Sequence, residues 1–203
     1  MGSDKAFLLL EGRTFISSIA SEMSKVSDDV MVMIGKKSRE EFEDALGPDV
    51  RVYPDDQYLG NPIGGIASAF PHVRHRHAAV VACDSPLVKA EVIEYLFTAL
   101  GQHSAAVPVW DEEDRMTMEP LCAVYDVAEA REAIAKAIGE GNETPKRMVL
   151  HLQDVLYVDV SQLRLVDQRL DSLMNVNTPT EYEALEDRMS SSTSDWQGFS
   201  REV

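Results

Sequence analysis

Cysteine is scarce in this 203-residue sequence, which contains only Cys83 and Cys122. The two residues lie too far apart for a CxxC pair, so the sequence indicates neither a redox dithiol nor a cysteine-based metal site. Isolated cysteines of this kind are usually small buried apolar residues, and we expect that role for both.

Long apolar runs are also missing. No stretch is long and apolar enough to cross a bilayer, and the first residues lack the basic region and apolar core that mark a signal peptide. We therefore expect a cytoplasmic protein that has no membrane partner.

Positive charge is in short supply, because 19 Lys and Arg residues face 35 Asp and Glu residues and leave a net charge of -16 at pH 7. Such a surface repels a phosphate backbone, which argues against a nucleic-acid partner. A small phosphate ligand is not excluded, because a local pocket can be positive or can hold a metal ion.

Two common catalytic patterns are absent. No segment fits the phosphate loop GxxxxGK[ST] or the nucleophile motif GxSxG. Three histidines, His72, His75 and His77, gather in one short stretch, but their spacing puts them on no common helical face. Because Pro71 indicates a connecting loop, we interpret this stretch as solvated rather than as a metal site.

The first hundred residues alternate between helical periodicity and short apolar segments. Strands are predicted at "VMVMI", "VRVY" and "HAAVVA", and helices are predicted to begin at Thr14, at Ser38, after the glycines of "GNPIGGI" and near Pro86. This alternation is typical of βαβ units, and it predicts an α/β fold with a parallel sheet and helices on both faces.

The second half of the sequence continues the pattern. "SAAVPVW" and "EPLCAVYD" predict two strands joined by an acidic loop, and "VLYVDV" predicts a last strand between helical segments. Without an internal repeat or linker, we expect one domain over residues 1–189. Residues 190–203 are polar and lack periodicity, so we expect a disordered tail that stability does not require.

Asp84 ends the apolar strand in "VVACDSP". In open α/β sheets, ligands bind outside the carboxyl ends of the strands, where a carboxylate is well placed to hold a divalent cation such as Mg²⁺. Asp is also a common N-cap residue of a following helix. For Asp84 alone, these two interpretations are about equally good.

Asp55 and Asp56 follow the preceding strand, so they would lie at the same edge of the sheet. Taken alone, they are best explained as a polar turn after Pro54. Two neighbouring strands that both end in Asp favour a site at this edge.

Gly60, Gly64 and Gly65 in "GNPIGGI" precede the predicted helix. They could bring backbone N–H groups and a helix N-terminus close to an anion. A tight connection between strand and helix explains the glycines almost as well.

Lys5 and two asparagines are the remaining candidates. Lys5 could act as a point charge on a phosphate, although a solvated terminal lysine is the simpler explanation. In "NVNTPTE", Thr178 is the predicted N-cap and Glu181 lies in the first helical turn, which leaves Asn175 and Asn177 without a structural role.

Taken together, these segments resemble the molybdenum cofactor guanylyltransferases, a branch of the nucleotidyltransferases. "MGSDKAFL" matches the last part of the family pattern LxGGxSxRMGxDKxxL, and "NPIGG" corresponds to the family's GPLxG turn. "CDSP" matches CDxP, "PLCAVY" matches PLxAxY, and "NVNTPTE" matches NVNTPxE. The order and spacing agree from residue 1 to about residue 188, and five motifs in order are specific although each is weak alone.

The resemblance implies a Rossmann-like, three-layer nucleotidyltransferase fold with a mostly parallel sheet. It also implies that the protein binds GTP and Mg²⁺ and transfers GMP to the terminal phosphate of the molybdopterin cofactor. Further implied partners are molybdoenzymes or their chaperones.

The resemblance also implies roles for individual residues. Lys5 would contact the GTP phosphates, Asp84 would hold Mg²⁺, and Asp55 would touch the nucleotide. Gly64 and Gly65 would lie on the nucleotide side of the cleft, and the asparagine pair of the "NVNTPTE" segment would lie on the cofactor side.

Two departures from the family pattern stand out. Met33 occupies a position where family members often carry asparagine, and the LxGGxSxR segment with the strand before it has no counterpart. We expect that Met1 corresponds to a methionine inside the family motif and that the natural reading frame starts upstream. The missing strand would be central, so its two neighbours would be left with unpaired edges, and we expect a poorly folded chain or a filled gap, with weak GTP binding.

Three functions remain open at this point: an active guanylyltransferase, a related nucleotidyltransferase that uses CTP or another acceptor, and a non-catalytic paralogue that binds the cofactor or a partner protein. The missing loop favours the paralogue. Retention of Lys5, Asp55 and Asp84 favours an enzyme.

Overall fold

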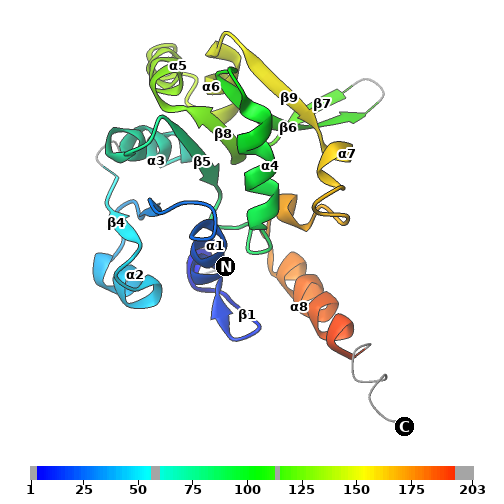
Figure 1. The fold of residues 1–203 in the computed structure, drawn as a ribbon. Helices are drawn as coiled ribbons and strands as arrows, with labels where there is room; N and C mark the ends of the chain where they lie inside the picture. Colours follow the sequence, from blue (N-terminus) through cyan, green and yellow to red (C-terminus); the bar gives the residue numbers. More distant parts are fainter. Residues whose placement is uncertain (1–3, 56–59, 113–114, 195–203) are drawn as a thin grey trace.

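The computed structural model describes residues 4–55, 60–112 and 115–194 as an α/β fold (Figure 1). The strands are β1 (Leu9–Leu10), β2 (Arg13–Thr14), β3 (Met31–Met33), β4 (Arg51–Tyr53), β5 (His77–Val81), β6 (Ala105–Glu112), β7 (Arg115–Met118), β8 (Cys122–Asp126) and β9 (Val155–Asp159). The helices are α1 (Phe15–Met23), α2 (Arg39–Leu46), α3 (Pro62–Ala69), α4 (Ala90–Leu100), α5 (Val127–Gly139), α6 (Pro145–His151), α7 (Val160–Leu163) and α8 (Pro179–Ser194). Short 3₁₀ turns are η1 (Lys5–Phe7), η2 (Phe70–His72) and η3 (Asp171–Leu173).

The largest sheet has five strands in the order β5-β8-β6-β7, with β9 paired to β6. Strand β8 lies antiparallel between β5 and β6, whereas β9 runs parallel to β6. Strands β5, β6 and β9 therefore share one direction, as expected for an α/β fold. The sheet is mixed rather than mostly parallel, because β8 pairs antiparallel with both β5 and β6, and β7 forms an antiparallel hairpin with β6.

Helices cover both faces of this sheet, which confirms the three-layer arrangement. Alternation along the strands turns Ala105 and Val107 toward α3, α5 and α6, while Ala106 faces α4 and α7. The two resulting core clusters are almost fully buried. Within the described residues, no helix combines the length and apolar character needed to cross a bilayer.

A second, two-stranded sheet pairs β3 with β4 in parallel, with Val32 opposite Val52. Phe42 of α2, Ile16 of α1 and Ala6 of η1 pack with it in a separate apolar cluster. No described strand joins this pair to the five-stranded sheet.

The hairpin β1–β2 lies against the closing helix. Leu10 and Phe15 pack with Val176 and Leu185, so segments near both ends of the described chain share one core. Figure 1 shows β1 beside α8. This arrangement brings the "DKAF" and "NVNTP" segments together, with Lys5 in contact with Asn177.

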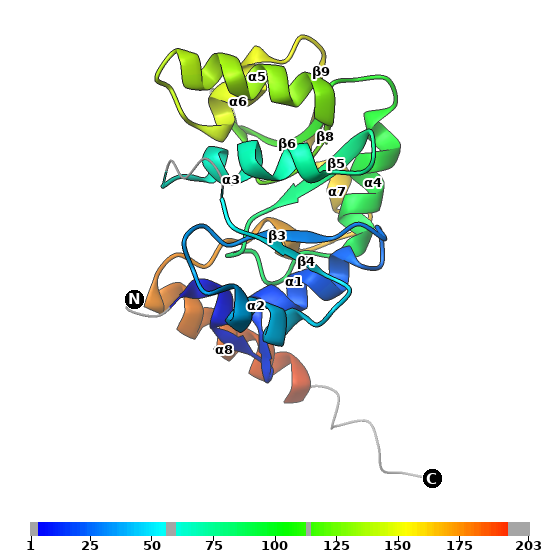
Figure 2. The same cartoon turned by 90° about the vertical axis from the view of Figure 1, so that its left-hand side faces the viewer.

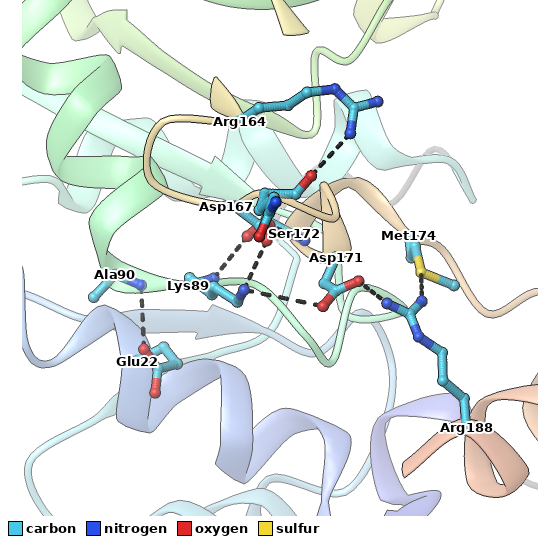
Figure 3. A network of polar contacts seen from close by, with 10 residues as sticks. Glu22, Lys89, Ala90, Arg164, Asp167, Asp171, Ser172, Met174 and Arg188 are labelled. Atoms are coloured by element: carbon cyan, nitrogen blue, oxygen red, sulfur yellow. Dashed lines mark hydrogen bonds and ion pairs between the residues drawn. The ribbon is translucent and has the colours of Figure 1, made fainter. Parts of the chain in front are cut away.

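Helix α4 begins at Ala90 rather than near Pro86. The backbone N–H of Ala90 donates to Glu22 Oε2 at 3.1 Å, and the N–H of Lys89 donates to Ser172 Oγ at 3.1 Å (Figure 3). These acceptors satisfy N–H groups at the start of the helix, a need that every helix N-terminus has. Because both come from distant segments, the helix start could not be read from local sequence.

Three further expectations need correction. Gly64 and Gly65 lie inside α3, because the helix already begins at Pro62 with Asn61 as its N-cap. The acidic connection after "SAAVPVW" is largely strand, since β6 and β7 form a hairpin that lengthens the sheet. Helix α8 continues to Ser194, into the segment expected to be disordered, because serine at a helix end costs little once the helix is formed. Residues 195–203 lie outside the described residues.

A network of charged side chains fastens the segment before α8 to the start of α4 (Figure 3). Lys89 Nζ lies 2.6 Å from Asp167 Oδ1 and 3.9 Å from Asp171 Oδ2. Asp167 is only 1% exposed, and its second oxygen accepts the Ser172 N–H at 2.8 Å. Arg188 of α8 donates to Asp171. Burial raises the pKa of Asp167, but the hydrogen bonds from Lys89 and Ser172 outweigh burial and hold the pKa below its usual value.

Replacing Lys89 by Met should lower the free energy of unfolding by about 2 kcal/mol, because it leaves a buried carboxylate without its cation. Since the pKa of Asp167 is lowered in the folded state, this difference should be present above the ordinary Asp pKa of about 3.9 and should vanish as the pH falls through the lowered value. Urea denaturation at a series of pH values measures both effects. The control R39M breaks only the exposed pair of Arg39 with Glu43 and should leave stability nearly unchanged; equal losses in the two variants would contradict the role of the network.

Candidate functional site

The carboxyl end of β5 is the centre of the candidate site. Asp84 lies three residues beyond the strand and is half-buried. Its backbone C=O accepts the N–H of Val176 at 2.8 Å, which ties the segment before α8 to this sheet edge. The alternative role of Asp84 as a helix N-cap is wrong, because α4 begins six residues later with Lys89 in the cap position.

Lys5 reaches this centre from the other end of the chain. Its Nζ donates to Asn177 Oδ1 at 2.8 Å and lies 3.6 Å from Asp84 Oδ2. The Lys5 side chain is 30% exposed, so it is neither a free surface lysine nor sealed from solvent. The alternative of a solvated terminal lysine is therefore wrong. Three residues predicted from separate motifs meet at one place.

Asn175 joins the same assembly through a hydroxyl group. Its Oδ1 accepts a hydrogen bond from Ser85 Oγ at 2.7 Å, directly beside Asp84. In the sequence, the predicted cap formed by Thr178 and Glu181 left the two asparagines without a structural role. In the structure, Asn175 contacts the segment after β5 and Asn177 contacts Lys5.

A capping box fixes Asn177 at the start of α8. Glu181 Oε2 accepts the N–H groups of Asn177 at 2.6 Å and Thr178 at 2.9 Å, while Thr178 Oγ1 accepts the Glu181 N–H at 3.2 Å. This confirms the predicted N-cap and its acidic partner. The two backbone hydrogen bonds lower the pKa of Glu181, so this anchor stays charged near neutral pH.

Asp55 contacts the turn after β3. Its Oδ1 accepts the Gly35 N–H at 3.1 Å, which closes the turn after β3, where Gly35 has a positive φ of 62°. Within the described ranges, no hydrogen bond or ion pair joins Asp55 to Lys5 or Asp84. Asp56 lies outside the described residues.

The two candidate glycines, Gly64 and Gly65, have different surroundings. The Gly64 N–H is already engaged, since it donates to Asn61 Oδ1 at 3.1 Å. A Cβ added at Gly65 would lie 3.8 Å from Asp55 Oδ2 and 3.9 Å from Met33 Cβ, which is ordinary van der Waals contact. The protein alone therefore does not require glycine at position 65.

Additional charges surround the centre. Lys37 Nζ lies 2.6 Å from Asp4 Oδ2, and both residues are close enough to Cys83 to influence its thiol. Enclosure of the sulfur and the negative charge of Asp84 raise the pKa of Cys83. Cys83 is nevertheless exposed as a residue, so the prediction that both cysteines are buried holds only for Cys122.

Sequence reasoning missed Ser85, Asp4 and Lys37. The serine was quoted only as part of "CDSP", although a hydroxyl beside a strand-end Asp is a recognisable feature. Nothing in the local pattern distinguishes Lys37 from an ordinary surface lysine, because its partner Asp4 is supplied by a distant segment.

The site contains one carboxylate suited to a metal ion rather than a complete set of protein ligands. Among the described residues, no group of three or more His, Cys, Asp or Glu side chains could hold a metal. The half-buried carboxylate of Asp84 could hold Mg²⁺ together with substrate phosphates and water, because Mg²⁺ is usually bound through one or two carboxylates and keeps several waters.

The family model described as MobA-like NTP transferase domain matches residues 1–155. The chain belongs to this family. It is 32% identical over 189 residues to the probable molybdenum cofactor guanylyltransferase of Methanosarcina acetivorans, covering 90% of this chain and 82% of the relative. It is 30% identical over 185 residues to the molybdenum cofactor guanylyltransferase of Desulfosudis oleivorans, covering 91% and 87%.

Solved structures agree with this MobA-like family assignment. The molybdopterin-guanine dinucleotide biosynthesis protein A of Archaeoglobus fulgidus superimposes with a TM-score of 0.76 at 26% identity, covering 94% of this chain and 92% of that chain. The 2-C-methyl-D-erythritol 4-phosphate cytidylyltransferase of Thermus thermophilus gives 0.73 at 17% identity, covering 92% and 93%. The second likeness shows the nucleotidyltransferase fold alone.

Replacing Thr178 by Ala should lower the free energy of unfolding by about 1 kcal/mol, because the N-cap hydroxyl that accepts the Glu181 N–H is lost. The variant T178S keeps the hydroxyl and should stay near the wild type. Urea denaturation measures the stability, and hydrogen exchange at the Asn177 N–H reports the loosened capping box. Unchanged exchange in T178A would show that the box does not hold Asn177.

Proposed function

We propose that this MobA-like protein is a cytoplasmic molybdenum cofactor guanylyltransferase, which transfers GMP from GTP to the terminal phosphate of the molybdopterin cofactor and releases pyrophosphate. The meeting of Lys5, Asp84 and Asn177 at the carboxyl end of β5 is the observation that carries the proposal. This is the edge at which open α/β sheets bind ligands. The names of relatives that match most of their own length support the same activity.

Lys5 is suited to bind the nucleotide phosphates. Its ammonium group now lies between Asn177 and Asp84, and it is exposed enough to meet a ligand. A lysine acts on phosphate as a compact point charge, so it needs no fixed fork geometry. In a chain of net charge -16, a local cation at the site also counters repulsion of the anionic substrates.

Asp84 is the residue that would hold Mg²⁺, with phosphate oxygens and water as the other ligands. The ion would supply neutralisation of the charge on the phosphates. The Val176 N–H donates to the backbone carbonyl of Asp84 and so fixes the backbone at this position. The side-chain carboxylate takes no part in this hydrogen bond.

The remaining residues would position the two substrates. Asn175 and Asn177 would face the cofactor, and Asp55, Gly64 and Gly65 would lie on the nucleotide side. In the transfer, an oxygen of the acceptor phosphate bonds to the α-phosphorus of GTP as the bond to the bridging oxygen breaks and pyrophosphate leaves. Reactions of this type depend on positioning and charge stabilisation more than on covalent catalysis.

Replacing Asp84 by Asn should reduce Mg²⁺-dependent pyrophosphate release at least about 100-fold, because the metal-binding charge is lost. The fold should survive, since Asp84 caps no helix and its pair with Lys5 is partly exposed. Pyrophosphate release and thermal unfolding are measured on the same preparations. The control D49N removes an exposed acid before β4 and should keep full activity. A folded D84N protein with wild-type activity would refute the assignment.

GTP should compete with a fluorescent GTP analogue at least about tenfold better than CTP does, if the guanylyltransferase assignment is correct. Better competition by CTP would instead favour a cytidylyltransferase, whose fold the structure shares.

Replacing Lys5 by Met should weaken GTP binding about tenfold, whereas the exposed control K25M should not. Equal binding by all proteins would remove Lys5 from the nucleotide site.

A further inference from the structure

The asparagine segment, residues 174–178, is a short connection between η3 and α8. Val176 at its centre is 2% exposed, whereas Asn175 and Asn177 on either side of it are exposed. Each asparagine already uses its side-chain carbonyl oxygen inside the protein: Asn175 accepts from Ser85. Asn177 accepts from Lys5. Among the described residues, no acceptor takes the side-chain N–H groups of either asparagine, so both remain donors for a ligand.

The start of the asparagine segment is fastened to the connection between β5 and α4. Lys89 in this connection contacts Asp167 and Asp171, and its backbone N–H donates to Ser172 Oγ at 3.1 Å (Figure 3). Asp84 lies in the same connection. These contacts therefore hold η3 against the residues that carry the candidate metal ligand.

The end of the asparagine segment continues into α8, which lies at the lower end of the molecule, below β3 and β5 in Figure 2. Arg188 of this helix donates to Asp171 and also to Met174 Sδ, the latter at 2.9 Å (Figure 3). The contact with Asp171 spans 17 positions of the chain. It joins the helix after the segment to the turn before the segment.

Both ends of the asparagine segment are therefore tied to Asp171. One of its oxygens accepts from Arg188, and the other lies 3.9 Å from Lys89 Nζ. The side chain of Asp171 is 15% exposed and that of Arg188 is 31% exposed, so water screens this pair less than it screens a surface pair. A fixed span between η3 and α8 leaves the residues between them little freedom, so the pair sets where the two amide groups point.

We propose that Arg188, acting through its pair with Asp171, is a positioning residue for the acceptor substrate. The pair holds the side-chain N–H groups of Asn175 and Asn177 beside Asp84 before the acceptor arrives. Donors that are ordered in advance lose less conformational entropy on binding, which strengthens the binding of the acceptor. This role rests on the proposed function, which assigns the two asparagines to the molybdopterin cofactor.

Replacing Arg188 by Met should raise the KM for the molybdopterin cofactor about tenfold, because the donors are no longer held in place before binding. The KM for GTP should stay within about twofold of the wild-type value, since Lys5 keeps its contact with Asp84. A purely structural role has a different signature, because loss of folded protein lowers the apparent kcat and leaves both KM values unchanged. Initial rates of pyrophosphate release, with each substrate varied in turn, give the two KM values.

Two matched variants serve as controls. R188K keeps the positive charge that faces Asp171 and should hold the cofactor KM within about threefold of the wild-type value. R169M removes an exposed arginine from the chain just before η3 and should change neither KM. If R188M does not fold, D171N weakens the same pair from its other side and should show the same rise in the cofactor KM alone.

Hydrogen exchange gives a readout that does not need catalysis. The Val176 N–H donates to the Asp84 carbonyl at 2.8 Å, and its exchange should be at least about fivefold faster in R188M than in R188K or R169M. An active wild type whose R188M variant keeps the cofactor KM would overturn the positioning role alone, even if exchange is faster. A wild type that neither transfers GMP nor binds the cofactor would refute the proposed function and this role with it.

Discussion

The hydrogen bond from the Val176 N–H to the Asp84 carbonyl holds the site together. Val176 is 2% exposed and packs with Leu10 and Phe15, so the same residue anchors the first hairpin and the end of β5. Its neighbours Asn175 and Asn177 are thereby placed beside Ser85 and Lys5, respectively. One long-range backbone contact therefore helps to place side chains from three distant parts of the chain.

The sequence allowed the α/β class, most strands and the N-caps at Thr14 and Thr178 to be predicted, because these depend on short-range periodicity and local capping. The MobA-like motifs also identified Lys5, Asp84 and Asn177, which the structure brings into contact. The three residues lie together because each motif stands at an element boundary, where the fold leaves little freedom; their roles in binding stay predictions.

Other features depend on contacts that local patterns do not contain. Helix α4 begins at Ala90 because Glu22 and Ser172 supply acceptors, and both are far away in sequence. Strand β8 runs antiparallel because the chain returns through the sheet, although its mostly apolar sequence equally suits a parallel strand. Asp55 was grouped with Asp84 by their common place at strand ends. In the structure, Asp55 instead binds the Gly35 turn, because β4 belongs to a separate sheet.

The contact between Lys5 and Asn177 spans 172 positions of the chain. During synthesis, the lysine leaves the ribosome long before its partner exists. At about 5–20 residues per second, the wait is roughly 10–35 s. Apolar residues around Lys5 must remain soluble, or be shielded by a chaperone, for that period. The acidic character of the chain offers one physical safeguard, because like charges keep nascent chains apart until α8 emerges and the two ends can meet.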